Sequence, residues 1–172
     1  LLDTPGPNEA GQHHLRHMLR DQLQKASAVL AVLDYTQLKS SADEQVREEL
    51  SNVADVSRER LFAIVNKFDE RDRNGMSKEE VTTFVHALMN GILEGGNIFA
   101  VSSKFGYLAN RARHELDLHD ALPDATKHPW VEDFGKDAFG PRWKSKIDDP
   151  TEARDAAEEL WKESLFDAPL NG

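Results

Sequence analysis

Short apolar runs alternate along the chain with longer segments in which apolar residues recur at helical spacing. Each run is compact and ends in polar residues, so we interpret the runs as short strands and expect the inner ones to be buried on both faces. Four runs show this pattern, namely Leu1–Thr4, Ser27–Tyr35, Leu61–Asp69 and Asn97–Lys104.

The segments between these runs are typical of helices that bury one face. Their apolar positions are Leu15, Met18, Leu19 and Leu23 in the first, Val46, Leu50 and Val53 in the second, and Val81, Phe84, Val85, Leu88 and Ile92 in the third. Alternating strands and helices predict an α/β fold with a mainly parallel sheet and flanking helices. Ligands of such sheets bind at the carboxyl ends of the strands, so the residues that leave each strand are the functional candidates.

The alternation stops near residue 119. Residues 119–149 are rich in Pro, Gly and Asp, and we expect an irregular segment pinned to the preceding residues by Trp130, Phe134, Phe139 and Trp143. Residues 150–172 are expected to start an amphipathic helical region, because one helical face carries Ala153, Ala156, Leu160 and Trp161.

Composition and charge narrow the possible functions. The chain has 172 residues, of which 39% are apolar, enough for one soluble domain with a core. Its 31 acidic and 21 basic residues give a net charge of −10, so we expect no direct DNA binding. No apolar run is long enough to cross a bilayer. The lack of cysteine is compatible with a reducing cytoplasm, the location that we expect.

Asp3 and Gly6 leave the first predicted strand in the sequence Asp-Thr-Pro-Gly. An Asp at this position can hold Mg²⁺, directly or through a water, and the Gly can offer its backbone N–H to a terminal phosphate. The same four residues also make a good turn, so both interpretations stay open here.

Asn66, Lys67 and Asp69 leave the strand that begins at Leu61. A carboxylate here can accept two hydrogen bonds from the N1–H and 2-amino groups of guanine, a donor pair that adenine lacks. Asn66 can tie neighbouring loops together, and Lys67 can lay its stem across the purine ring. A purely structural loop of charged residues is the alternative.

Ser102, Ser103 and Lys104 leave the strand that begins at Asn97. A backbone N–H in this loop can reach the guanine O6, and Lys104 can shield the ring. Short Ser-Lys loops are common, so this signature has weight only together with the other two. Three such signatures in this order, each at a strand end, predict a guanine-nucleotide site.

The order DTPG, NKFD, SSK resembles the second half of a P-loop GTPase domain. The phrases LLDTPGPNEAGQ, ASAVLAVLDYTQLKS, GYLANRARHEL and WVEDF are similar to the bacterial dynamin-like GTPases. The resemblance implies GTP or GDP and Mg²⁺ as ligands of the complete protein. It implies that Asp3 would hold the Mg²⁺ through a water and that Gly6 would meet the γ-phosphate.

The resemblance also assigns the base site and the partners. It implies guanine binding by Asn66, Lys67, Asp69, Ser102, Ser103 and Lys104, and self-association through the GTPase domain. The complete protein would keep sister replication forks together. It would contact a sliding DNA clamp through an amino-terminal region that this chain lacks.

The chain departs from the family in one respect, because it contains no G-x-x-x-x-G-K-[ST] sequence. Without this phosphate cradle we expect the chain alone neither to bind GTP tightly nor to hydrolyse it, and we assign no catalytic residue. We therefore expect a fragment that starts after the P-loop. Residues 1–118 would be the carboxyl-terminal part of the GTPase domain, followed by the segments 119–149 and 150–172.

Two other functions remain open from the sequence. One is a scaffold that keeps the GTPase fold without hydrolysing GTP, and the other is a GTPase of translation or ribosome assembly. The segment Glu70–Val81 also imitates a calcium-binding loop, but the acid expected at its last position is replaced by Val81.

Overall fold

The structure is a computed structural model that describes residues 25–38, 60–89, 91–93 and 95–171. The described residues form two compact units. The first holds those up to Asn66 together with Glu70–Ala100, and the second holds Lys67–Asp69 and the residues from Val101 onward. The strand predicted at Leu1–Thr4, with Asp3 and Gly6, lies outside the described residues, as do the helices predicted around Leu15–Leu23 and Val46–Val53.

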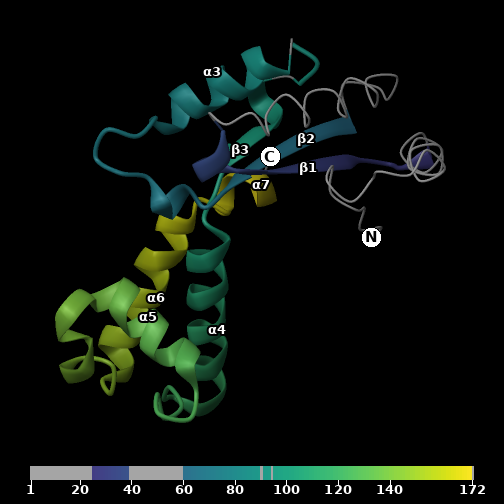
Figure 1. Cartoon of the computed structure of the whole chain (residues 1–172). Helices are drawn as coiled ribbons and strands as arrows, with labels where there is room; N and C mark the ends of the chain where they lie inside the picture. The colour runs from purple at the N-terminus through teal and green to yellow at the C-terminus, as the bar shows by residue number, and fades with distance from the viewer. Residues whose placement is uncertain (1–24, 39–59, 90, 94, 172) are drawn as a thin grey trace, which may run out of the picture. The chain divides into compact units, whose positions relative to one another are not determined.

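Three parallel strands, in the order β1-β2-β3, form the sheet of the first unit (Figure 1). Their bounds are Val29–Asp34 for β1, Leu61–Asn66 for β2 and Ile98–Ala100 for β3. Asp34 lies opposite Asn66 in the register, so β1 and β2 end at the same level. The predicted α/β fold with a parallel sheet is confirmed.

The strands differ in burial. Leu61, Ala63 and Val65 of β2 are buried. By contrast, Leu30 and Val32 of β1 are 54% and 66% exposed. The expectation that β1 is buried on both faces is therefore wrong, because the side chains of Leu30 and Val32 are exposed in this structure.

Helix α3 (Lys78–Leu88) connects β2 to β3. It begins at a capping box, in which the Ser77 N–H donates to Glu80 Oε2 (2.6 Å) and the Glu80 N–H donates to Ser77 Oγ (3.2 Å). Val81 and Val85 are its buried positions, as the apolar spacing predicts. Ile92, included in the predicted pattern, lies beyond the helix end.

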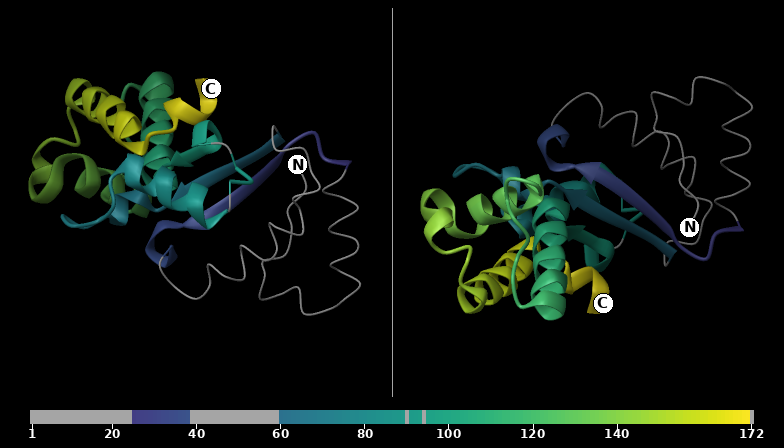
Figure 2. Two further views of the ribbon diagram at one scale, coloured as in Figure 1. Left: turned by 90° about the horizontal axis from the view of Figure 1, so that it is seen from above. Right: turned by 90° about the horizontal axis from the view of Figure 1, so that it is seen from below.

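The second unit is helical. Its helices are α4 (Ser103–His119), α5 (Pro129–Phe139), α6 (Pro150–Ser164) and α7 (Asp167–Asn171). Short 3-10 turns also occur in the two units, at Tyr35–Gln37, Phe68–Glu70, Gly95–Asn97 and Gly140–Ser145. Helices α4 and α6 lie side by side in all views (Figures 1 and 2).

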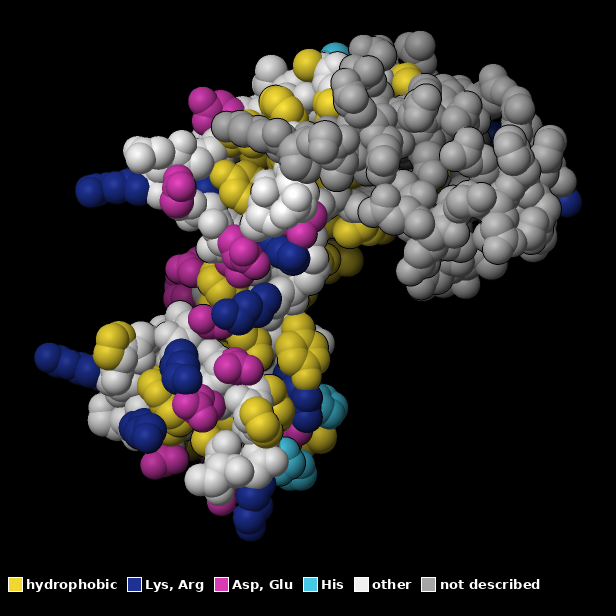
Figure 3. All heavy atoms as spheres, viewed as in Figure 1, with side chains coloured by type: hydrophobic (Ala, Val, Ile, Leu, Met, Phe, Trp, Pro, Cys, Tyr) yellow, Lys and Arg dark blue, Asp and Glu magenta, His cyan; other side chains and the backbone are white. Residues whose placement is uncertain are grey.

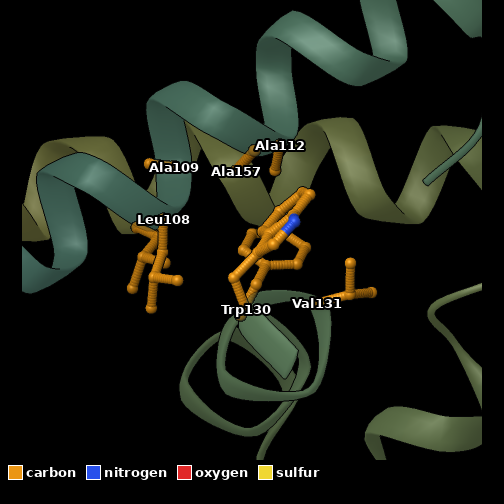
Figure 4. Close-up of a cluster of buried hydrophobic side chains, with 8 residues drawn as sticks. Leu108, Ala109, Ala112, Trp130, Val131 and Ala157 are labelled. Carbon is orange, nitrogen blue, oxygen red and sulfur yellow. The ribbon is translucent and has the colours of Figure 1, made fainter. Parts of the chain in front are cut away.

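Small side chains allow the helices of the second unit to pack closely. Ala109 and Ala112 of α4 and Ala157 of α6 are completely buried in one cluster (Figure 4). Trp130 and Phe134 of α5 fill the space beside them. These alanines let the two helix backbones approach, while Trp130 and Phe134 of α5 add large apolar side chains to the same cluster.

The segment 119–149 is not irregular as predicted, since residues 129–139 form helix α5. Pro129 occupies the first turn, where a missing N–H costs nothing, and Trp130, Val131 and Phe134 then fall on one buried face. Trp130, Phe134 and Phe139 pack in the cluster that holds the buried residues of α4, as expected, whereas Trp143 lies against Gly135 of α5. Helix α6 confirms the amphipathic helix predicted after residue 150.

Arg154 of α6 fastens the carboxyl end of α4. Its guanidinium donates to Asp117 Oδ1 and Asp120 Oδ1, each at 2.9 Å, and to the Leu116 carbonyl. The Leu116 carbonyl already accepts from the N–H of the left-handed Asp120 (φ 51°) that ends α4, so Arg154 gives it a second donor. A cation at this end also opposes the negative pole of the helix dipole.

The surface of the second unit mixes both signs of charge. On the face seen in Figure 3, basic and acidic side chains are interspersed over the helices. Within the described residues, no helix combines the length and the apolar character needed to cross a membrane.

Gly135 tests the packing of α5. A Cβ at this position would lie 2.5 Å from Trp143 Cε3 and 2.9 Å from Cδ2. An exposed helical Gly→Ala change gains about 1 kcal/mol, but overpacking costs about 1–3 kcal/mol, so Gly135→Ala should lower the free energy of unfolding. Chemical denaturation measures the change. Gly96→Ala is the control, because a Cβ added at Gly96 would meet nothing within 4 Å beyond its neighbours in the chain. A Gly135→Ala variant that is more stable than the unaltered protein would contradict this packing.

Candidate nucleotide-base site

The loop after β2 turns sharply at Lys67. Asn66 is the last residue of β2, and Lys67 has a left-handed backbone with φ of 64°. This conformation is uncommon for a residue with a long side chain and costs free energy. The turn leads directly into the 3-10 turn Phe68–Glu70, which contains Asp69.

A backbone hydrogen bond joins this loop to the one that follows β3. The Phe68 N–H donates to the Val101 carbonyl at 3.1 Å. Both residues belong to the second unit, together with Lys67, Asp69 and the sequence Ser102–Lys104. Two of the three loops predicted from the sequence are thereby brought together.

Ser102 is buried and starts helix α4. Its Oγ accepts a hydrogen bond from the Phe105 N–H (3.1 Å), and its carbonyl accepts one from the Gly106 N–H (3.0 Å). Its own N–H donates to the carbonyl of Ser164, at the end of α6, at 2.9 Å. The backbone of this loop is therefore held by both α4 and α6.

Asp69 carries a buried acceptor without a donor. Its Oδ1 is inaccessible to solvent and accepts no hydrogen bond in the structure. Buried polar atoms are nearly always paired, since an unpaired one loses its hydration and gains nothing in return. Asp69 Oδ1 is therefore an acceptor to which the structure gives no donor.

Lys104, in the first turn of α4, forms an ion pair with Asp137 of α5. The distance from Lys104 Nζ to Asp137 Oδ2 is 2.7 Å. The hydrogen bond with Asp137 raises the pKa of Lys104 above its ordinary value, and partial burial opposes this rise. The charges of Asp137, Asp69 and Asp133 raise the same pKa further, so several carboxylates act on one ammonium group.

The predicted site residues thus fall into three groups. Lys67, Asp69, Ser102, Ser103 and Lys104 belong to the second unit, Asn66 ends β2 in the first unit, and Asp3 and Gly6 lie outside the described residues. Sequence reasoning missed Asp137 and Ser164, which contact the second of the two loops. No local pattern distinguishes either residue from other polar positions on its helix.

In the segment Glu70–Val81, which resembles a calcium-binding loop, polar side chains hydrogen-bond to the backbone. Asp72 Oδ1 accepts from the Asn74 N–H (2.8 Å), and Glu80 is engaged in the cap of α3. Among the described residues, no group of three or more His, Cys, Asp or Glu could hold a metal ion. The segment instead borders an open surface pocket of about 300 Å³, lined by Tyr35, Thr36, Glu70, Asp72, Asn74, Gly75 and Met76.

The parallel sheet, with polar loops at the ends of β2 and β3, is consistent with part of an α/β domain of the P-loop type. Over 172 residues the chain is 52% identical to Clamp-binding protein CrfC of Escherichia coli. It is 51% identical to the protein of the same name from Escherichia coli strain K12. Each match covers 99% of the chain but only 23% of the relative. No protein-family model and no solved structure matches the chain.

Ser102→Ala tests how the second loop is anchored. The change removes the acceptor of the Phe105 N–H at the start of α4, and loss of such a cap costs about 1 kcal/mol of stability. Chemical denaturation should show this decrease. Ser145→Ala, which removes an exposed hydroxyl bonded to the Arg142 carbonyl, should change stability by less than about 0.5 kcal/mol. Equal effects of the two changes would show that Ser102 is not an anchor.

Proposed function

We propose that this chain recognises the base in a longer guanine-nucleotide-binding protein of the bacterial dynamin-like class. The buried, unpaired Oδ1 of Asp69 is the observation that carries this proposal. The guanine N1–H and 2-amino groups are two adjacent donors that suit one carboxylate. Adenine offers no such pair, so it would leave the carboxylate desolvated and unsatisfied.

The neighbouring residues fit the same ligand. The Phe68 N–H bond to Val101 holds the Asp69 loop beside the start of α4. Backbone N–H groups in the first turn of a helix have no intrahelical acceptor, and one of them can donate to the guanine O6. Lys67 and Lys104 would cover the faces of the ring with their alkyl stems.

Most contacts to the phosphates would come from residues of the longer protein that this sequence does not contain. The chain has no Gly-rich Lys-Ser/Thr loop, and Asp3 and Gly6 are the only candidates that we assign to the Mg²⁺ and γ-phosphate side. We therefore propose that tight GTP binding, hydrolysis and nucleotide-linked self-association belong to the longer protein. The 23% coverage of the relatives supports such a longer protein.

The relatives suggest the cellular context. Both are named clamp-binding proteins, and we extend this partnership with a sliding DNA clamp to the longer protein. Because a sliding clamp acts in DNA replication, we place the longer protein at replication forks in the cytoplasm. The net charge of −10 supports contact with DNA through the clamp rather than through this chain.

Asp69→Asn in the longer protein tests base recognition. The amide replaces one acceptor with a donor, so it mismatches guanine and matches xanthine, whose C2 carries an oxygen. GDP affinity should fall at least about tenfold, and XDP affinity should rise. Competition against a fluorescent guanine nucleotide measures both affinities.

The adjacent exposed Glu70 provides the control for that experiment. Glu70→Gln removes a neighbouring charge without touching the proposed base acceptor, and GDP affinity should stay within about twofold of the unaltered protein. Unchanged GDP affinity in Asp69→Asn would overturn the proposed function. It would favour a scaffold that uses the fold without reading the base.

A further inference from the structure

Two carboxylates act on the Lys104 ammonium group. Asp137 of α5 is its ion-pair partner, at 2.7 Å, and Asp69 is the proposed acceptor of the base. The bond from the Phe68 N–H to the Val101 carbonyl (3.1 Å) holds the loop that carries Asp69 beside the start of α4, where Lys104 lies. Lys104 is 52% exposed and Asp137 only 21% exposed. The pair therefore has one firmly placed partner, Asp137, and one flexible partner, the lysine stem.

The alternative partner is the proposed base reader. Asp69 Oδ1 is buried and accepts no hydrogen bond in the structure. A lysine stem has four carbons and three ammonium donors that rotate freely, so it can turn from one neighbouring carboxylate to another. If Lys104 paired with Asp69, its ammonium would occupy the acceptor that guanine needs.

The position of Lys104 makes such a pairing favourable once its present partner is lost. A cation in the first turn of a helix is opposed by the positive pole of the helix dipole, and a nearby carboxylate offsets this. Asp133 also acts on Lys104, but its side chain is exposed and its attraction is screened by water and salt. Asp69 is partly buried, where the attraction between charges is stronger.

We propose that Asp137 is a positioning residue that holds the Lys104 ammonium away from Asp69 and so keeps the base acceptor open. This proposal rests on the proposed function. It assigns α5 a part in base recognition, although Asp137 touches no nucleotide. The role is specific to the carboxylate, since only a competing anion of fixed position can restrain the lysine.

A double-mutant cycle in the longer protein tests this role. Asp137→Ala should lower GDP affinity about tenfold or more, because the base must then displace a charged hydrogen bond from Asp69. Lys104→Gln removes both the competing ammonium and the stem that covers the ring, so its GDP affinity serves only as the reference for the double variant. The double variant Asp137→Ala/Lys104→Gln should bind GDP more tightly than Asp137→Ala and as tightly as Lys104→Gln, a recovery that loss of a merely structural contact would not allow.

A matched control exists on the same helix. Glu132→Ala removes a carboxylate from the Lys136 pair at 2.8 Å on α5, and GDP affinity should not change. The proposal is overturned if Asp137→Ala binds GDP normally, or if the double variant binds GDP no more tightly than Asp137→Ala.

A structural readout separates this proposal from the proposed function. If the unaltered protein binds no guanine nucleotide, the proposed function fails, and the cycle has no signal. A crystal structure of nucleotide-free Asp137→Ala then decides the inference. Lys104 Nζ should lie within about 3 Å of an Asp69 carboxylate oxygen, and a lysine that remains turned away from Asp69 would overturn the inference.

Discussion

The close packing of α4 against α6 is the constraint on which the second unit depends. Ala109 and Ala112 meet the α6 side at Ala157, where larger side chains would force the helices apart. Arg154 holds the far end of α4, and the Ser164 carbonyl holds the N–H that precedes its first turn. Helix α6 thus holds α4 at both ends. The loop that leads into α4 is held in position by the same contacts.

The proposed base site combines an anchored backbone with an unsatisfied side chain. Hydrogen bonds at Phe68 and Ser102 fix the two loops, while Asp69 Oδ1 has no donor and Lys67 has a left-handed backbone. The last two features lower stability, and only a surrounding structure that determines the loops independently can maintain them. The packed core of α4, α5 and α6 is such a structure, because it holds α4 in place without any contribution from Asp69 or Lys67.

Much of this arrangement could be predicted from the sequence, because it depends on local patterns. The apolar runs gave the three described strands, and polar residues at their ends gave the candidate loops. Helix α5 was missed because Pro, Gly and Asp were given more weight than the spacing of Trp130, Val131 and Phe134 behind Pro129. The Lys104–Asp137 pair could not be predicted, since it forms only after α4 and α5 pack.

The bond from the Ser102 N–H to the Ser164 carbonyl has a mechanical consequence. This bond joins the end of α6 to the start of α4. Because α6 is a continuous helix of 15 residues, a displacement along its axis moves both of its ends together. A load applied near Pro150 would therefore be delivered to the backbone between β3 and α4. Any displacement of α6 along its axis would in this way shift the peptide groups at the start of α4.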